Sequence, residues 1–184
     1  TFKLSSGVMI LSKYPLELIK HVVFDVSKKS DKGAQKGCSL VKININNKAI
    51  FLAGTHLDSK NNNSRSLQYQ ITNDEILKPY LNDSIPLLIA GDFNTDFKSS
   101  QYDSMMTSFK LKNFELNDDR PYTFDEFNTW NAKGYKAWID FIFFQENKNI
   151  KVFNQYILRP VMKYKNTKMD LADHYQIVIE AVIY

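Results

Sequence analysis

Polar side chains that could hold a metal ion and a phosphate follow the apolar run at residues 86–90. This run is typical of a buried strand; it ends at Gly91 and is followed by Asp92 and Asn94 at alternate positions. Because successive strand residues point to opposite faces, the two side chains share a face if the extended backbone continues. Carboxylate oxygens bind Mg²⁺, and an amide can donate to a phosphoryl oxygen. A polar turn is the other interpretation, since Asp and Asn are common in turns.

Three other places near predicted strand ends carry polar side chains: His56, Asp140 and the neighbours Asp173 and His174. A lone histidine such as His56 more often has a structural role than a catalytic one. Asp173 fits a helix N-cap or a turn, but that explanation gives His174 no role. The sequence leaves these alternatives open for each position taken alone.

Asp140 lies in the middle of the apolar run Trp-Ile-Asp-Phe-Ile-Phe-Phe at residues 138–144. A buried carboxylate is unfavourable unless another group pairs with it. A histidine is one suitable partner, because the carboxylate fixes its tautomer and stabilises its imidazolium form. A salt bridge to Lys136 or Arg159 is the alternative.

The composition is that of one globular domain, because 184 residues with 43% hydrophobic side chains can bury a sizeable core. The formal net charge of +4 suits an anionic substrate or surface, but it is too small and too dispersed to indicate a nucleic-acid interface. A single cysteine, Cys38, excludes an internal disulfide. No apolar run approaches the length of a membrane span, and residues 1–6 do not form a signal peptide. The compartment stays open, and secretion is compatible with the sequence.

Strands are expected to outnumber helices. A hairpin is expected at residues 37–53, because Asn46 and Asn47 are a turn signal between two apolar segments. The other expected strands cover residues 7–11, 21–26, 86–90, 136–144, 150–164 and 175–184, with loops at 28–36 and 165–168 and irregular chain at 113–130.

Two helices are expected. The first begins near residue 65 with Ser64 as its N-cap, and it ends or kinks before Pro79. The second covers residues 101–109. The side chains expected to point inward are Leu67, Ile71 and Leu77 in the first helix and Met105 and Phe109 in the second.

Taken together, these motifs resemble those of the endonuclease/exonuclease/phosphatase superfamily, which shares the fold of pancreatic deoxyribonuclease. The matching pieces, in family order, lie at residues 7–15, 54–57, 65–68, 91–94, 139–141 and 171–175. Within the superfamily the chain most resembles the neutral (type C) sphingomyelinases, on residues 31–42, 54–58 and 122–125. The resemblance implies an α+β fold, a four-layer α/β/β/α sandwich of two packed, mostly antiparallel sheets.

The resemblance also implies roles for the candidate residues. Asp92 would sit at the metal and phosphate centre, and Asn94 would contact the scissile phosphate. His174 would activate water while Asp140 holds it, and His56 would donate to the phosphate or to the leaving oxygen. Asp173 resembles an acidic residue near the metal, so the implied metal ligands are Asp92, Asp173 and His174. The implied metal is Mg²⁺, with Mn²⁺ or another divalent cation as the alternative.

One departure concerns the metal site. In the family, an Asn on the first strand and a Glu that binds Mg²⁺ both lie upstream of the strand that resembles residues 7–11. The chain starts after both, and Glu17 is a poor substitute because it follows Pro15. We therefore expect a single catalytic domain over residues 1–184 that is incomplete at its N-terminus.

The function implied is that of a Mg²⁺-dependent phosphodiester hydrolase that releases phosphocholine from sphingomyelin. The alternatives are an endonuclease of the same fold and a non-catalytic relic that lacks the metal-binding Glu. The expected partner is a phospholipid head group, with nucleic acid second, and the chain is expected to be monomeric. Secreted sphingomyelinases carry an aromatic hairpin that dips into membranes before the final Asp-His, and here that interval is short. Phe153, Tyr156 and Tyr164 are interpreted as core or hairpin packing, with a reduced version of that hairpin as the alternative. Peripheral membrane contact stays open.

Overall fold

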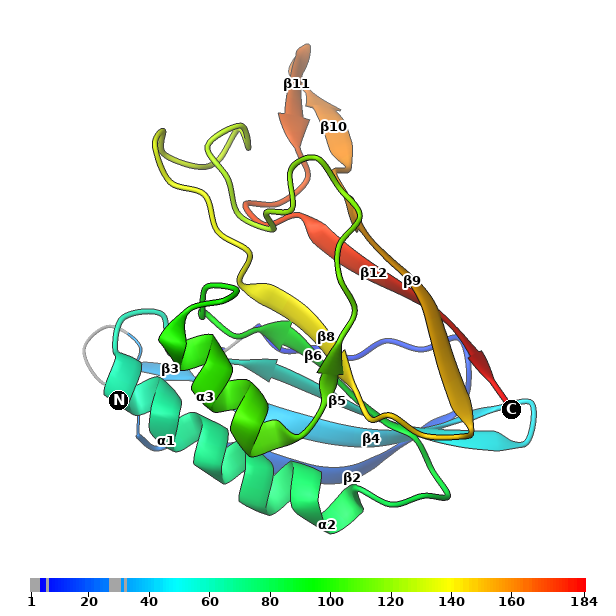
Figure 1. The fold of residues 1–184 in the computed structure, drawn as a ribbon. Helices are drawn as coiled ribbons and strands as arrows, with labels where there is room; N and C mark the ends of the chain where they lie inside the picture. The colour runs from blue at the N-terminus through cyan, green and yellow to red at the C-terminus, as the bar shows by residue number, and fades with distance from the viewer. Residues whose placement is uncertain (1–3, 6, 27–30, 32) are drawn as a thin grey trace.

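The computed structural model describes residues 4–5, 7–26, 31 and 33–184 (Figure 1). The chain is α+β, as predicted, and antiparallel pairings predominate among the described strands. Part of the loop predicted at residues 28–36 lies outside the described residues. The end of that loop forms a short strand instead, β3, which pairs in parallel with β1.

Six strands form the main sheet, in the order β2–β4–β5–β6–β8–β7. Their bounds are Leu16–Val23 for β2, Gly37–Ile45 for β4, Lys48–His56 for β5, Leu87–Asp92 for β6, Asp140–Phe144 for β8 and Lys112–Asn113 for β7. The predicted hairpin is confirmed as β4 and β5. Its turn residues Asn46 and Asn47 both have positive φ, as a tight two-residue hairpin turn requires.

Two strand bounds differ from the prediction. The strand expected at residues 21–26 begins earlier, at Leu16, directly after Pro15. Proline removes only its own donor, and the carbonyl of Pro15 still accepts from the Asn44 amide at 3.2 Å. The strand expected at residues 136–144 begins later, so that Asp140 is the first residue of β8 and not its middle.

The remaining described strands form three two-stranded sheets. Their bounds are Ile150–Leu158 for β9 and Gln176–Ile183 for β12, Val161–Tyr164 for β10 and Thr167–Asp170 for β11, and Leu4–Ser5 for β1 and Ala34–Gln35 for β3. The β10–β11 hairpin projects beyond the main sheet (Figure 1). Its residues Thr167 and Lys168 were expected in a loop but belong to β11. Phe153 and Tyr164 are exposed, so of the two expected roles, core packing or hairpin packing, the first is wrong for both.

The helices are α1 (Asn62–Thr72), the π-helix η2 (Asn73–Leu77), α2 (Lys78–Tyr80) and α3 (Ser100–Phe109). The first begins earlier than predicted because Asn61, not Ser64, is the N-cap: Asn61 Oδ1 accepts from the Ser64 amide at 2.9 Å. Pro79 does not end the helix at Lys78, since a proline near the start of the short helix α2 breaks no bond that α2 needs. None of the described helices has the length and apolarity needed to cross a lipid bilayer.

The inward side chains predicted for the first helix are confirmed in part, because Leu77 is fully buried and Ile71 packs against the core. Leu67 is 47% exposed, and polar side chains such as Arg65 and Gln68 are buried in its place. The predictions for α3 are confirmed, because Met105 and Phe109 are fully buried.

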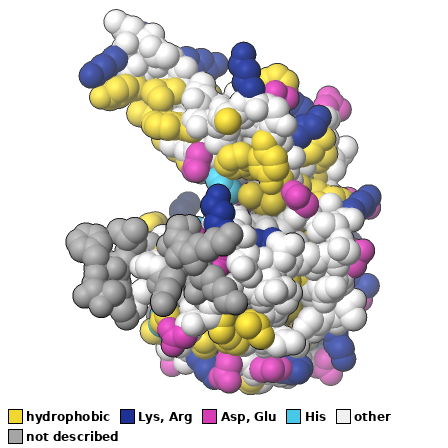
Figure 2. Space-filling model, turned by 90° about the vertical axis from the view of Figure 1, so that its left-hand side faces the viewer, with side chains coloured by type: hydrophobic (Ala, Val, Ile, Leu, Met, Phe, Trp, Pro, Cys, Tyr) yellow, Lys and Arg dark blue, Asp and Glu magenta, His cyan; other side chains and the backbone are white. Residues whose placement is uncertain are grey.

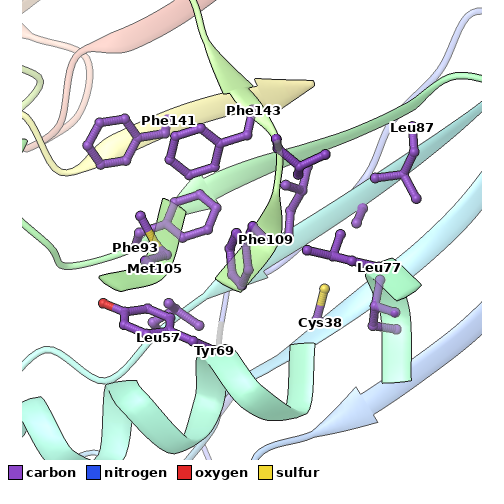
Figure 3. Packing of buried hydrophobic residues seen from close by; sticks show 14 of the residues in the cluster. Cys38, Leu57, Tyr69, Leu77, Leu87, Phe93, Met105, Phe109, Phe141 and Phe143 are labelled. Atoms are coloured by element: carbon purple, nitrogen blue, oxygen red, sulfur yellow. The ribbon is translucent and has the colours of Figure 1, made fainter. Parts of the chain in front are cut away.

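The core lies between these helices and one face of the main sheet (Figure 3). Phe141 and Phe143 of β8 pack with Phe93, whose ring centroid lies 4.9 Å from that of Phe143. Phe109 of α3 contacts the same group from the helical side. These rings are fully buried, and each contributes a large apolar area to the hydrophobic stabilisation of the fold.

Residues 7–11, expected as a buried strand, lie outside the strands of the described structure. The side chains of this segment nevertheless alternate between the sheet and the solvent. A β-carbon at Gly54 would lie 3.2 Å from Ile10 Cγ1 and 3.4 Å from Val8 Cγ1, whereas Met9 is 75% exposed. Leu11 is 80% exposed as well, so the prediction of a buried strand is wrong for both burial and pairing: one side of the segment faces the solvent, and a ladder also requires a neighbouring strand within hydrogen-bonding distance.

Strand alternation places the polar candidates on the face of the sheet away from the helices. Phe141 and Phe143 point into the core, so Asp140 points to the opposite side. Ile89 also points into the core, so Asp92 belongs to the opposite face as well. The helices and the candidate site therefore occupy different faces of one sheet.

The backbones of β5 and β6 approach so closely at Gly91 that no space is left for a β-carbon. It has φ of +154°, and a β-carbon there would lie 1.9 Å from the carbonyl oxygen of Thr55. We predict that Gly91→Ala lowers the free energy of unfolding by about 2 kcal/mol or more, through steric strain next to backbone that cannot move away. Urea unfolding measures this effect.

Gly33→Ala is the matched control, since a β-carbon at Gly33 meets no atom within 4 Å. This variant is expected to keep or slightly raise the stability of the protein. Equal unfolding midpoints for the two variants would contradict the close approach at Gly91.

Candidate functional site

Three candidate side chains form one row across the main sheet, because their strands are neighbours in register. His56 at the end of β5 lies opposite Asp92 at the end of β6, and Asp92 lies opposite Asp140 at the start of β8. His56 Nε2 is 3.4 Å from Asp92 Oδ2. A histidine and two carboxylates that are distant in the sequence thus meet at one edge of the sheet.

His174 joins this group from the segment that precedes β12. Its Nδ1 lies 2.8 Å from Asp140 Oδ2, which confirms a histidine as the partner of Asp140. The alternative partners are engaged elsewhere: Arg159 pairs with Asp118 at 2.9 Å, and Lys136 lies over an aromatic ring. The Asp140 side chain is 16% exposed, so it is less buried than a position in the middle of a core strand would be.

Asn94 lies close to Asp92, but not for the predicted reason. Its φ is +49°, so the extended geometry does not continue and strand alternation does not apply. A tight turn brings the two residues together instead: the Asn94 amide donates to Asp92 Oδ1 at 2.8 Å. Asn94 Nδ2 donates to Asp92 Oδ2 at 3.1 Å and to the Leu57 carbonyl at 2.9 Å. The polar-turn interpretation and the site interpretation therefore describe the same structure.

A pocket of about 570 Å³ opens over this group. Figure 2 shows a hollow between the upper and lower parts of this face, with a histidine side chain inside it and acidic and basic side chains at its margin. The residues that line the pocket include His56, Asp92, Asn94, Asp173 and His174, together with Lys36, Lys60, Phe124 and Tyr135. All predicted site residues except Asp140 thus line one pocket, and Asp140 contacts it through His174.

The profile of the Endonuclease/Exonuclease/phosphatase family matches residues 1–174. The chain belongs to this family.

Curated members of the family with similar sequences carry the names of phospholipid-cleaving enzymes. Sphingomyelinase C 2 of Leptospira interrogans serogroup Icterohaemorrhagiae serovar Lai is 28% identical over 196 residues, which cover 94% of this chain and 31% of the relative. Phospholipase C of Staphylococcus aureus is 31% identical over 121 residues, 61% of this chain and 35% of the relative. The chain therefore spans about a third of the length of these curated relatives.

Solved structures share the fold. A variant of beta toxin from Staphylococcus aureus with bound magnesium ions has a TM-score of 0.80 at 22% identity, covering 98% of this chain and 69% of that chain. Sphingomyelinase C from Streptomyces griseocarneus has a TM-score of 0.72 at 19% identity, covering 91% of this chain and 65% of that chain. The fold is accordingly that of the DNase I-like proteins, as predicted. The four-layer sandwich stays a prediction.

Burial and neighbouring carboxylates together shift the ionisation of this group of site residues. Burial, followed by the charge of Asp140, raises the pKa of Asp92 to about 6. His174 and His56 oppose this shift, and so does the hydrogen bond from the Asn94 amide. Like charges in one buried place disfavour ionisation, so Asp92 is a group that a cation would stabilise in its charged form.

The same charges act on His174 in the opposite sense. Burial disfavours its imidazolium form, but the hydrogen bond and the charge of Asp140 outweigh burial and raise the pKa of His174 to about 9. The carboxylates of Asp92 and Asp173 add to this rise. In the metal-free protein His174 therefore carries a proton at neutral pH and partly neutralises the acidic group.

The residues present fit a divalent cation. One ligand atom from each of Asp92, Asp140 and His174 can be chosen so that all three lie within 4.8 Å of one another. Two carboxylates supply oxygen donors of the kind that Mg²⁺ prefers, and the raised pKa of Asp92 marks uncompensated negative charge. Asp173, predicted as a ligand, lines the pocket but is not part of this group in the described structure. Its role as a ligand stays a prediction.

Sequence reasoning missed Lys36 as a member of the site. It is only 4% exposed, and its Nζ donates to the Leu57 carbonyl at 2.6 Å and lies 2.9 Å from Asp31 Oδ2. The same Nζ is 3.1 Å from His56 Nε2. Lys36 falls in a lysine-rich stretch that is typical of a solvated loop, so its burial was not visible from local composition. The one available signal was the resemblance of residues 31–42 to a sphingomyelinase segment.

Thr123 was also missed, although it lies in residues 122–125, one of the segments that resemble the neutral sphingomyelinases. Its fully buried hydroxyl accepts from the amides of Ile139 and Asp140, both at 3.1 Å. Its carbonyl accepts from the Tyr175 amide at 2.7 Å. Thr123 thus holds the backbone at Asp140 and at Tyr175, the residue after His174, and so supports both partners of the Asp140–His174 contact.

The segment after Thr123 fastens the approach to His174 as well. Asn128 Nδ2 donates to the Ala172 carbonyl and Asn131 Nδ2 to the Asp173 carbonyl, both at 2.9 Å. The Thr129 amide donates to Asp170 Oδ2 at 2.8 Å. Hydrogen bonds from residues 128–131 therefore hold residues 170–173, the segment that leads to His174.

The family motif that contains Arg65 and Gln68 supports the other end of the row. Gln68 Oε1 accepts from the Asp58 amide and Arg65 donates to the Asp58 carbonyl, both at 2.8 Å. These buried polar side chains of α1 hold the turn that follows His56. This explains why the inner face of α1 is polar at the position where an apolar face was expected.

We predict that Thr123→Val lowers the free energy of unfolding by about 2 kcal/mol, because two buried amides lose their common acceptor. Thr123→Ser keeps the hydroxyl oxygen and loses one methyl group, so it should cost about 1 kcal/mol. Chemical denaturation of both variants measures the difference. A smaller loss of unfolding free energy in Thr123→Val than in Thr123→Ser would show that the hydroxyl does not hold these two amides.

Titration of His174 by NMR in the metal-free protein provides another test. We expect a pKa of about 9 in the wild type and a value close to the ordinary 6.5 in Asp140→Asn, which removes the main charge that holds the proton. His21 is exposed and pairs with Ser39, so its resonance is the internal control. An unchanged His174 titration in the variant would contradict the assigned coupling.

The pH dependence of stability has a definite sign. The folded-state pKa of His174 lies above its unfolded value, so its contribution is fully present below pH 6.5 and is lost as the pH rises through 9. We therefore expect His174→Gln to flatten the fall in unfolding free energy between pH 6.5 and 9. Urea unfolding of both proteins across this interval, without metal, measures the effect.

Proposed function

We propose that the chain is the catalytic part of a metal-dependent phosphodiesterase that cleaves sphingomyelin to ceramide and phosphocholine. The observation that carries the proposal is the group of Asp92, Asp140 and His174, with the 2.8 Å contact between Asp140 and His174, beneath a pocket of about 570 Å³. The substrate class is supported by relatives that are named sphingomyelinase C and phospholipase C.

His174 is the general base in this proposal. Asp140 holds the ring through Nδ1, so that Nε2 is the atom left to take a proton from the attacking water. A cation held by Asp92 and Asp140 would neutralise their charges and lower the pKa of His174 from about 9, so that the ring could accept that proton.

His56 and Asn94 serve the other side of the phosphate. His56 lies at the opposite end of the row from Asp140 and is placed to donate a proton to the leaving oxygen. The Asn94 amide, now donating to Asp92 and Leu57, can donate to a non-bridging oxygen after a small rotation. An attacking base and a donor on opposite sides of the phosphorus suit in-line displacement.

The cation is assigned to the carboxylates of Asp92 and Asp140 with His174 beside them, and Asp173 is retained as a further ligand. Bound Mg²⁺ supplies charge stabilisation on the phosphoryl oxygens, worth several kcal/mol to order of magnitude. Mn²⁺ is the expected functional substitute, since carboxylate oxygens suit both ions.

The β10–β11 hairpin suits contact with a membrane surface. Val161, Met162 and Tyr164 are exposed on it, and lysines accompany them in the same hairpin. Exposed apolar side chains with neighbouring cations favour binding to the interface of an anionic bilayer. We include this peripheral contact in the proposal.

The proposal predicts Mg²⁺-dependent hydrolysis of sphingomyelin vesicles by the 184-residue chain, abolished by a chelator. His174→Ala should lower the rate about 10²- to 10⁴-fold, the usual size of a general base contribution. His21→Ala, an exposed histidine on β2, is the matched control and should keep full activity. Phosphocholine release measures the reaction.

Parallel assays with plasmid DNA separate the competing functions. Faster cleavage of DNA than of sphingomyelin would favour an endonuclease. Inertness toward both substrates, with a cooperative unfolding transition intact, would favour a non-catalytic member of the family.

A further inference from the structure

An aromatic wall continues from His174 along one side of the pocket. The ring of Phe124 meets the ring of His174 nearly edge to face, with centroids 5.1 Å apart, and the ring of Tyr135 meets Phe124 in the same manner at 5.5 Å. Phe124 is fixed by paired backbone hydrogen bonds with Ala137, of 3.0 and 2.8 Å. Tyr135 is 50% exposed, so a large part of its ring faces the solvent. The core does not account for this exposed aromatic surface.

The side chains at the two ends of the pocket differ in character, and a single series of contacts connects them. In order of contact or strand register, its members are Lys36, His56, Asp92, Asp140, His174, Phe124 and Tyr135. The lysine stands at one end and the two aromatic rings stand at the other. The two ends of the pocket therefore differ in chemical character, and the aromatic end offers carbon surface in place of hydrogen-bonding groups.

Negative charge surrounds the aromatic end. Asp173 lines the pocket next to His174. Burial raises the pKa of the Tyr135 hydroxyl, and the carboxylates of Asp96 and Asp92 raise it further against the opposing effect of Arg65. Carboxylates that act on Tyr135 in this way also favour a cation at its ring.

We propose that Tyr135 and Phe124 form the subsite that selects a quaternary ammonium head group. The substrate class in this inference rests on the proposed function. The electron-rich face of an aromatic ring attracts a cation, and rings of this kind recognise quaternary ammonium ligands. Tyr135, at the open end of the wall, is the residue that determines head-group specificity.

The chemistry of the wall favours a quaternary over a primary ammonium. A primary ammonium has three N–H donors, and burying them against carbon leaves them without acceptors, which is unfavourable. A trimethylammonium group has no N–H donor, and its methyl groups pack against aromatic carbon. The subsite should therefore prefer phosphocholine to phosphoethanolamine.

Isothermal titration calorimetry on the 184-residue chain tests this preference without turnover. The probes are phosphocholine, phosphoethanolamine and inorganic phosphate. The wild type should bind phosphocholine most tightly. Tyr135→Leu should weaken phosphocholine binding about fivefold, the size of a half-exposed cation–π contact, and should leave the affinity for inorganic phosphate unchanged.

Two further variants make the test specific. Tyr135→Phe keeps the ring and should keep the affinity for phosphocholine. Phe127→Leu changes an aromatic residue that is 66% exposed and does not line the pocket, and it should have no effect on any probe. Equal affinity of the wild type for phosphocholine and phosphoethanolamine would overturn the proposal, and so would an equal loss of all three probes in Tyr135→Leu.

The source of the ammonium group is resolved by comparing two substrates, soluble p-nitrophenylphosphocholine and sphingomyelin vesicles. A loss of rate on both in Tyr135→Leu supports contact with the head group itself. A loss on vesicles alone would overturn the proposal and indicate contact with the lipid surface. Selective binding of phosphocholine without hydrolysis would refute the proposed function but keep the subsite, whereas hydrolysis without selective binding would do the reverse.

Discussion

The register of β6 and β8, which sets Asp92 beside Asp140, is the constraint on which the rest of the site depends. Two carboxylates on adjacent strands repel each other, and partial burial strengthens the repulsion. The surrounding chain brings other polar side chains to this pair from three separate places: His174 from the segment before β12, His56 from β5 and, in contact with His56, Lys36 from the junction of β3 and β4. Lys36 and His174 come from chain outside the strands, whereas His56 is held by the ladder of β5 with β6.

These segments are held by hydrogen bonds to buried polar groups, because irregular chain has no ladder of its own. Thr123 serves β8 and Tyr175 at the same time, and α1 uses Arg65 and Gln68 to hold the turn after His56. The aromatic core carries the sheet and its helices, but it lies on the opposite face and does not reach the site. The precision of the site therefore depends on a few hydrogen bonds more than on hydrophobic burial, and a single polar substitution can disturb it without unfolding the sheet.

This division explains how much the sequence revealed. The buried strand at β6, the hairpin of β4 and β5, helix α3 and the pairing of Asp140 with a histidine follow from apolar pattern, turn chemistry and the cost of burying a charge. The proximity of Asn94 to Asp92 was expected from strand alternation and arises from a turn, because local pattern does not report where a backbone leaves the extended region. Lys36 was hidden because a charged residue in a lysine-rich stretch is buried only when distant acceptors, here Asp31 and Leu57, are brought to it. Residues 7–11 were expected to form a buried strand but form no ladder and leave Met9 and Leu11 exposed, since pairing depends on a neighbour that local sequence does not specify.

Proton and cation compete for the same charge at this site. Without a metal, the carboxylates hold a proton on His174 and raise the pKa of Asp92, so the cluster is partly neutralised by protons. In the proposed mechanism, a divalent cation held by Asp92 and Asp140 would supply that neutralisation more fully, and it would lower the pKa of the His174 ring that is proposed to act as a base. In this mechanism, cation binding and deprotonation of His174 are thermodynamically linked. The affinity for the cation therefore rises with pH across the interval in which His174 loses its proton. If the proposed mechanism holds, His174 would stay protonated, and so unable to act as a base, until a cation bound beside it.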